Sequence, residues 1–205
     1  MFSGISLITI INGLSGGSEL QPFNEAVETL VRPFRSSFLT PIMLFVSNIG
    51  SPFILSFLAL ILAIVIVIHR DTYSAFLFVI SIGLSIVSFT FLKNWFHFPR
   101  PSGGLVSLSS YSFPSAHATV ATSFFFATGY AFMDWSKSAV VKVALTFGCI
   151  FAVALISFSR VYLGVHFALD VLAGISLGLL TTSFTALVFN IFIEEQGFNT
   201  RRKRM

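Results

Sequence analysis

The chain has 205 residues, of which 55% are hydrophobic and 10% are charged, and its mean hydropathy is +0.91. Soluble domains carry roughly a quarter charged residues, so this composition excludes a soluble globular protein, and its hydrophobicity excludes a disordered chain. The net charge of +4 comes from only 12 basic and 8 acidic residues, so the position of each charge becomes informative. The single Cys149 excludes an internal disulfide and a thiolate metal cluster. A polytopic helical membrane protein remains.

The N-terminal quarter predicts short elements. Residues 4–14 are apolar, lack the basic flank and cleavage site of a signal peptide, and predict a short or partly embedded helix. After a flexible break at 15–18, residues 21–34 predict an amphipathic helix, which suits either the membrane interface or an outer loop. Its apolar positions recur at helical spacing and are Phe23, Val27, Leu30, Val31 and Phe34. Residues 38–49 predict a second half-embedded segment, broken at Pro41.

Five long apolar stretches follow, and each is about long enough to cross a hydrocarbon core, which takes roughly 20 helical residues. They cover residues 52–69, 73–92, 116–133, 139–158 and 167–193. They lack the alternation of barrel strands. We therefore expect an all-α polytopic membrane bundle of about six transmembrane helices, the first one short, plus an interfacial amphipathic helix. One domain is expected over residues 1–205.

The loop charges predict the orientation. A basic cluster at 201–204 belongs in the cytoplasm by the positive-inside rule. Alternation then places Lys137, Lys142 and the segment 69–71 on the same side. The opposite side holds residues 93–115 and 159–166, where positive charge is disfavoured and a retained cation is a functional candidate. We expect a multi-pass protein of the cell (inner) membrane with a cytoplasmic C-terminus.

The first polar cluster on that outer side holds two cations. Lys93 and Arg100 are seven residues apart at the end of a predicted span, and the flanking Pro99 and Pro101 place Arg100 in a loop. Two converging cations suit a phosphate, which Arg grips bidentately. The alternative is that both side chains simply extend to the membrane interface.

The second cluster opens the next predicted span. Pro114 fits the first turn of a helix, and the free N–H groups there favour an anion. Ser115 adds a hydroxyl, and His117 is placed to give a proton to a leaving group. Taken alone, a His at this position is more often a polar cap.

The third cluster is Ser159-Arg160, then His166 and Asp170. His166 and Asp170 are spaced i and i+4, so they share a helix face. A carboxylate on one ring nitrogen fixes the tautomer and leaves the other nitrogen free to attack. A purely structural His–Asp pair is the alternative. His97, outside these clusters, is interpreted as an interfacial residue.

Lys-x6-Arg-Pro, Pro-Ser-x-His and Ser-Arg-x5-His-x3-Asp occur in this order between residues 93 and 170. This series resembles the type 2 phosphatidic acid phosphatase (PAP2) superfamily of membrane lipid phosphatases. The resemblance implies a phosphatase with His166 as nucleophile, Asp170 orienting it, and His117 as acid and base. The phosphate-binding residues that it implies are Lys93, Arg100, Ser115 and Arg160.

The family usually has Gly where this chain has Ala116, a change that is benign if the residue lies in the first helical turn. No cofactor and no metal are implied, because three fixed cations replace a metal ion. No second carboxylate accompanies Asp170 to build a Mg²⁺ site.

The resemblance implies a metal-independent lipid phosphatase that works through a phosphohistidine, and the loop charges lead us to expect its site on the extracytoplasmic face. Candidate substrates are undecaprenyl diphosphate and related polyprenyl diphosphates, phosphatidylglycerol phosphate and phosphatidic acid, since the motifs read the phosphate and not the lipid tail. A lipid phosphotransferase would use the same site. A non-catalytic lipid-binding or transport protein is the third alternative, disfavoured because no member of the set is missing. The expected partners are the lipid substrate and the bilayer, with no nucleic acid.

Overall fold

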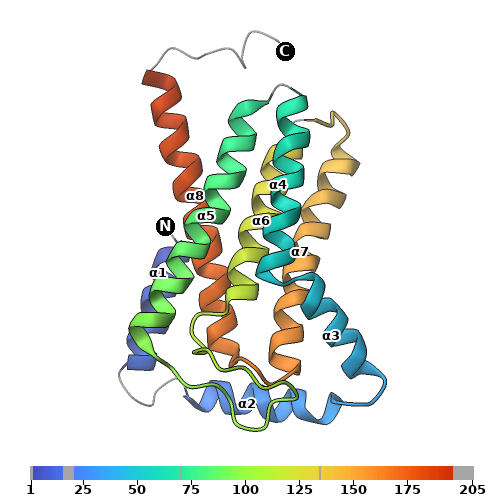
Figure 1. Cartoon of the computed structure of the whole chain (residues 1–205), viewed down its shortest axis with the longest axis vertical. Helices are drawn as coiled ribbons and strands as arrows, with labels where there is room; N and C mark the ends of the chain where they lie inside the picture. The colour runs from blue at the N-terminus through green and yellow to red at the C-terminus, as the bar shows by residue number, and fades with distance from the viewer. Residues whose placement is uncertain (1, 16–20, 70, 134, 196–205) are drawn as a thin grey trace.

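The computed structural model describes residues 2–15, 21–69, 71–133 and 135–195. Regular structure within these ranges is entirely helical (Figure 1). The helices are α1 (Phe2–Ser15), α2 (Gln21–Val31), the 3-10 turn Arg32–Phe34, α3 (Leu39–Ile49), α4 (Pro52–Ile68), α5 (Thr72–Phe96), α6 (Ala116–Met133), α7 (Ala139–Tyr162) and α8 (Ala168–Glu195). The predicted all-α membrane class is confirmed.

The five predicted apolar stretches correspond to α4 to α8. By length and composition α5, α7 and α8 can each cross a membrane, and α3 with α4 forms a fourth candidate span bent by 47°. α1 has 14 residues, about 21 Å of helix, which is shorter than a hydrocarbon core. α6 is rich in small and polar residues because it is buried among the other helices. The count of six spans therefore stays a prediction.

Close contact between α6 and α8 organises the bundle near the predicted polar clusters. α6 packs against α4, α5, α7 and α8. On α8, a Cβ atom at Gly174 would lie 2.7 Å from the carbonyl oxygen of Ser115, and one at Gly178 would lie 2.5 Å from that of Thr119. Glycines four residues apart let two membrane helices approach backbone to backbone. This approach holds the N-terminal ends of α6 and α8 together.

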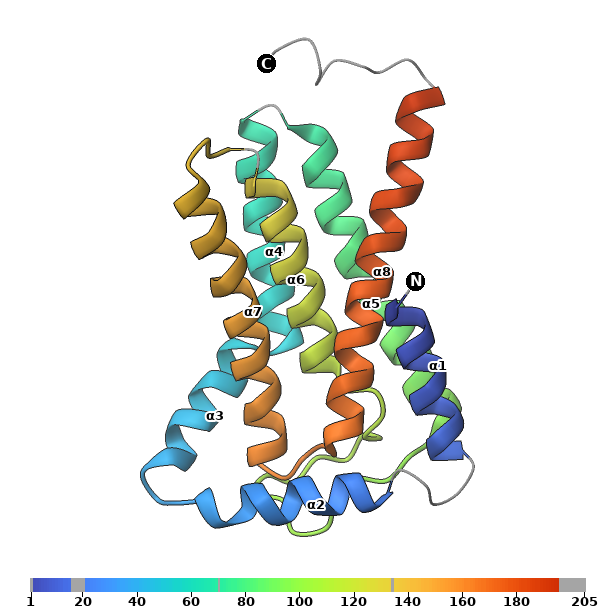
Figure 2. The same cartoon turned by 180° about the vertical axis from the view of Figure 1, so that it is seen from behind.

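The predicted amphipathic helix lies across one end of the bundle as α2 (Figure 2). It buries Asn24 and Val31 against the bundle and leaves Phe23 and Leu30 exposed. The α-helix ends at Val31 and not at 34 as predicted, and Phe34 is exposed in the 3-10 turn that follows. The predicted break at Pro41 is wrong, because α3 runs through this residue. Pro41 is the third residue of that helix, where a backbone N–H would have no intrahelical partner.

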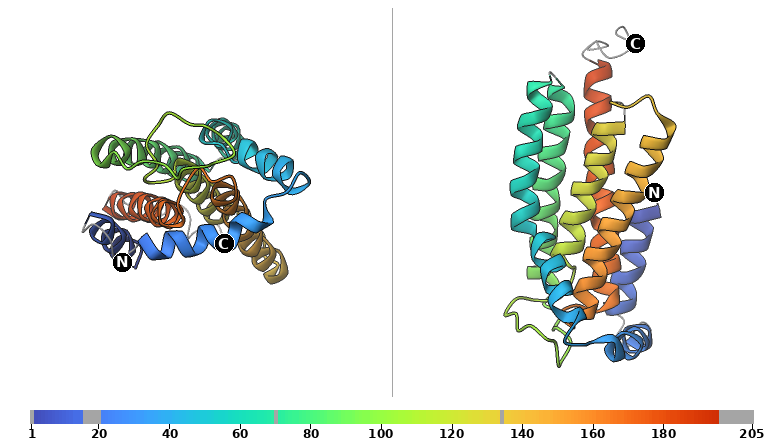
Figure 3. Two further views of the ribbon diagram at one scale, coloured as in Figure 1. Left: turned by 90° about the horizontal axis from the view of Figure 1, so that it is seen from below. Right: turned by 90° about the vertical axis from the view of Figure 1, so that its right-hand side faces the viewer.

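The connections alternate between the two ends of the bundle, as the charge pattern predicts. The α4–α5 and α6–α7 connections, with His69 and Lys137, lie at the end that α8 reaches with Glu195 (Figure 1). The loop 97–115 and the short loop 163–167 lie together at the opposite end, beside α2 (Figure 3). Arg70, residues 16–18 of the predicted break and the basic cluster 201–204 lie outside the described residues.

Candidate active site

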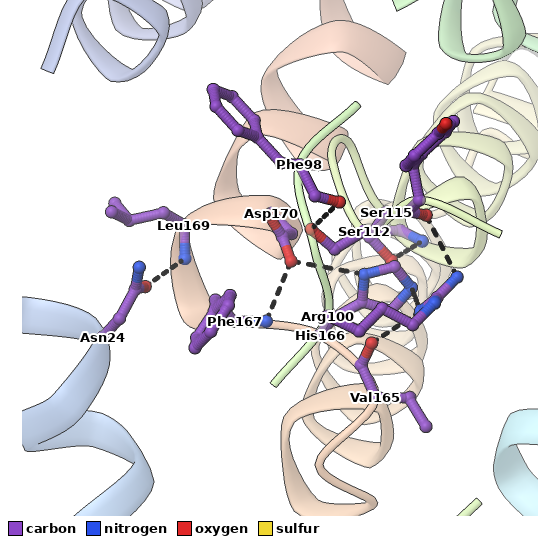
Figure 4. Close-up of polar contacts among 12 residues, drawn as sticks. Asn24, Phe98, Arg100, Ser112, Ser115, Val165, His166, Phe167, Leu169 and Asp170 are labelled. Atoms are coloured by element: carbon purple, nitrogen blue, oxygen red, sulfur yellow. Dashed lines mark hydrogen bonds and ion pairs between the residues drawn. The ribbon is translucent and has the colours of Figure 1, made fainter. Parts of the chain in front are cut away.

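The structure brings the three predicted clusters together at the end of the bundle that carries α2 (Figure 4). Lys93 lies in the last turn of α5, and His97 ends that helix in the left-handed conformation with φ of 52°. The chain then turns away, so Arg100 projects from the loop, as predicted. The exposed ring of His97 lies against Tyr111, with centroids 4.4 Å apart, in keeping with an interfacial residue.

Backbone carbonyl groups hold both cations of the first cluster. Lys93 Nζ donates to the carbonyl oxygens of Tyr111 at 2.5 Å and Ser112 at 3.2 Å. Arg100 donates from Nε to Ser110 at 2.7 Å and from one terminal nitrogen to Val165 at 2.5 Å. The loop 97–115 thus folds back over Lys93 of α5 and over its own Arg100, and it positions both cations next to the loop that precedes α8.

The same terminal nitrogen of Arg100 lies 3.3 Å from Nε2 of His166. A guanidinium can only donate, so Nε2 is the acceptor and the ring proton belongs on Nδ1. Burial, then the positive charges of Arg100, Arg160 and Lys93, lower the pKa of His166 well below its ordinary value. The imidazole is therefore neutral at physiological pH, with the lone pair on Nε2. Burial also lowers the pKa of Arg100, which the Asp170 carboxylate partly opposes.

Asp170 lies on the other side of the ring. Its Oδ2 is 3.5 Å from His166 Nδ1 and also accepts a hydrogen bond from the backbone N–H of Phe167 at 2.9 Å. Both side chains are buried, at 2% exposure for His166 and 3% for Asp170. The expectation that the pair shares a helix face is wrong, because α8 begins at Ala168: His166 lies in the preceding loop and only Asp170, the third residue of α8, is helical. The arrangement matches a neutral histidine oriented by a carboxylate.

α6 begins at Ala116, two residues after Pro114, so the expectation that Pro114 lies in the first turn is wrong. Ser115 is the N-cap: its hydroxyl accepts from Ala118 N at 3.5 Å, and its own N–H donates to the backbone carbonyl of Asp170 at 2.9 Å. The backbone N–H groups of Ala116 and His117, in the first turn of α6, have no hydrogen-bond acceptor in the described part of the chain. An anion there would meet both donors.

Ala116 occupies the first helical turn, and its φ is not positive, so the exchange for glycine carries no backbone strain. The favoured expectation for this departure from the family pattern is confirmed.

Arg160 approaches the site from the last turn of α7. It is 6% exposed, donates to the hydroxyl of Ser47 on α3, and keeps its Nε without a partner in the described part of the chain. The ring of His117, in the first turn of α6, lies close to the backbone of Ser47. Both residues lie within electrostatic range of His166. A buried cation with a free donor matches a site that receives an anion.

Sequence reasoning missed two residues of this region. Ser47, 3% exposed, joins α3 to Arg160, and Asn24, 2% exposed, joins α2 to the start of α8. Each is a polar residue on a helix face that packs against the bundle, and the sequence alone does not indicate which distant residue it contacts. Over the described residues, no three His, Cys, Asp or Glu side chains gather where they could hold a metal ion.

The family model described as the PAP2 superfamily matches residues 74–193, which include all three clusters. The chain belongs to the PAP2 superfamily. It is also 31% identical over 192 residues to phosphatidylglycerophosphatase B of Bacillus subtilis (strain 168), an alignment that covers 90% of this chain and 87% of that one. The resemblance inferred from the motifs is confirmed, and the chain is a PAP2 membrane lipid phosphatase.

Two solved structures resemble this PAP2 protein. The crystal structure of the first transmembrane PAP2 type phosphatidylglycerolphosphate phosphatase from Bacillus subtilis matches with a TM-score of 0.81 and 28% identity, and covers 100% of both chains. The crystal structure of Aquifex aeolicus LpxE matches with a TM-score of 0.62 and 24% identity over 80% of this chain and 94% of that one. The second likeness concerns the fold alone.

Proposed function

We propose that this PAP2 protein hydrolyses the terminal phosphate monoester of phosphatidylglycerol phosphate on the extracytoplasmic face, through a phosphohistidine on His166 and without a metal ion. The observation that carries the proposal is the contact between Arg100 and Nε2 of His166. It gives a neutral nucleophilic nitrogen with a phosphate-binding cation directly beside it.

In the first step, Nε2 of His166 attacks phosphorus. The P–N bond forms while the bond from phosphorus to the lipid oxygen breaks, and His117 gives its proton to that oxygen, which leaves as the lipid alcohol. Asp170 keeps the Nδ1 proton in place and stabilises the positive charge that develops on the ring. Lys93 and Arg100 neutralise the phosphoryl oxygens.

In the second step, His117 takes a proton from water, and the resulting oxygen attacks the phosphohistidine. The P–N bond breaks, inorganic phosphate leaves, and both histidines return to their starting states. Arg160 and the first-turn N–H groups at Ala116 and His117 contribute donors to the phosphoryl oxygens in both steps. Arg100 must move its contact from Nε2 to the phosphate before attack, because the guanidinium shields the nucleophile.

The choice of substrate is supported by the likeness to proteins named for phosphatidylglycerol phosphate. The sidedness follows from Lys137 and Lys142, which lie towards the opposite end, and from the basic residues at 201–204.

Phosphate release by the purified protein tests the chemistry. Phosphatidylglycerol phosphate, undecaprenyl diphosphate and phosphatidic acid are compared in excess chelator, with His166→Ala beside the wild type and Lys142→Gln as control. We expect release from the first substrate to exceed the others and to vanish in His166→Ala. A requirement for Mg²⁺, or activity that survives in His166→Ala, contradicts the mechanism. Glycerol supplied as an acceptor distinguishes transfer from hydrolysis by the phosphoglycerol formed.

Labelling of introduced cysteines tests the sidedness. The reporter cysteine is placed in the loop 97–115 by Ser102→Cys, because a side chain at the neighbouring Gly103 would be strained at its φ of +85°. The background is Cys149→Ala, and Ser136→Cys reports on the opposite end of the bundle. We expect an impermeant reagent to label position 102 in intact cells and position 136 only after lysis. The reverse pattern refutes an extracytoplasmic site.

A further inference from the structure

The start of α8, which carries the His166–Asp170 pair, lacks a cap of its own. Phe167 precedes the first helical residue and has no side-chain acceptor, although the first N–H groups of a helix need one. Asp170 reaches back to Phe167 N at 2.9 Å, which satisfies one of these groups. The N–H of Leu169 needs an acceptor from elsewhere.

Asn24 of α2 supplies that acceptor. Its Oδ1 accepts from the N–H of Leu169 at 3.2 Å, across 145 residues of sequence (Figure 4). Asn24 is 2% exposed, although it lies on an amphipathic helix whose neighbour Phe23 is 45% exposed. A buried amide is not needed to hold a helix at a membrane surface, where apolar side chains suffice. The burial of Asn24 is therefore explained by its hydrogen bond to the N-terminal end of α8.

The other end of α2 is fixed to α7. Beyond the 3-10 turn, Arg35 donates from Nε to the carbonyl oxygen of Tyr162 at 2.8 Å and pairs with Glu28 at 2.8 Å. The segment 24–35 therefore bridges the two helix ends that carry Arg160 and the His166–Asp170 pair. This second attachment makes the position of Asn24 a fixed one.

We propose that Asn24 is a positioning residue for catalysis, because it holds the start of α8 so that Asp170 faces Nδ1 of His166. The proposal rests on the proposed function. With Asn24 in place, Asp170 accepts the hydrogen bond from Phe167 N and keeps its Oδ2 3.5 Å from His166 Nδ1, a buried nitrogen with no hydrogen-bond partner among the described residues. Without it, the first turn of α8 loosens and the 3.5 Å approach of Asp170 to the imidazole is lost.

The test compares Asn24→Leu, which removes the acceptor, with Asn24→Asp, which keeps one. Ser6→Ala is the matched control, because Ser6 on α1 receives a 3.2 Å hydrogen bond from Ser176 of α8, six residues beyond Asp170. All variants are assayed for phosphate release and for thermal unfolding in detergent. We expect kcat to fall about 10- to 100-fold in Asn24→Leu, the cost of misplacing a catalytic group, with KM nearly constant. Asn24→Asp should keep kcat within about threefold.

Each other result overturns the inference. A kcat of Asn24→Leu equal to that of Ser6→Ala shows that the bond is structural only, as does an equal loss in Asn24→Leu and Asn24→Asp. A change confined to KM assigns Asn24 to binding. If instead the wild type releases no phosphate, or His166→Ala retains activity, the proposed function fails first and independently of Asn24.

Discussion

Arg100 places a guanidinium nitrogen 3.3 Å from Nε2 of His166, so one cation both lowers the basicity of the histidine and occupies the space next to its lone pair. The two roles predict a specific pH signature. Loss of the cation stabilises the imidazolium and raises the pKa of His166, so activity disappears at a higher pH as the solution is acidified.

Arg100→Gln is therefore expected to move the acidic limb of the kcat/KM profile to higher pH. It should also lower the plateau about 10- to 100-fold, through the lost charge-assisted contact with phosphate. The measurement is kcat/KM between pH 4.5 and 8.5, with Lys142→Gln as control. An acidic limb that stays in place would mean that Arg100 does not act on the nucleophile.

Asp170→Asn should lower kcat about 10⁴-fold. An amide can donate to Nδ1, which forces the proton onto Nε2 and removes the attacking lone pair, and exchanges of this kind in catalytic triads have about that cost. Initial rates at saturating substrate give kcat, and the thermal transition of the same sample reports folding. A loss below tenfold in a folded variant would assign the His166–Asp170 pair to structure.

Ser47→Ala should weaken the site from the side of α3. The variant removes the hydroxyl that accepts a hydrogen bond from Arg160. Because the Nε of Arg160 already lacks a partner among the described residues, the guanidinium loses its fixed orientation. We expect kcat/KM to fall about 10- to 100-fold. Ser56→Ala is the control, because that hydroxyl donates within α4, to the carbonyl oxygen of Pro52 at 2.6 Å. Equal kcat/KM in both variants would exclude a role for Ser47.

Gly174→Ala should separate the two helices that carry the site. The added methyl group would lie 2.7 Å from the backbone oxygen of Ser115, which cannot give way without moving α6. Overpacking costs about 1–3 kcal/mol, which lowers the apparent Tm by about 2 to 12 °C in a chain of this size. Gly148→Ala meets no atom within 4 Å and should leave the Tm nearly unchanged. Matching Tm values for the two variants would contradict the close packing.

The apolar stretches were sufficient to predict where α4 to α8 lie along the chain. They do not show which of these helices face lipid and which are buried within the protein. α6 can be rich in alanine, serine and threonine because other helices surround it, and Pro41 is accommodated because it falls in the first turn of α3. The number of spans depends on such helices, so composition alone could not determine it.

The proposed catalytic residues could be located because three short motifs in a fixed order carry them, although the helical geometry expected for His166 and Asp170 applies only to Asp170. Asn24 and Ser47 could not, because their partners lie 145 and 113 residues away in sequence. Ser115 was located but its role was incomplete, since its backbone bond to Asp170 is formed only where α6 and α8 lie side by side.

The bond from the N–H of Ser115 to the carbonyl oxygen of Asp170 uses main-chain atoms alone. Any replacement at these positions other than proline at 115 leaves both atoms present. The junction between the start of α6, which bears His117, and the start of α8, which follows His166, can therefore survive side-chain changes at the two positions that form it.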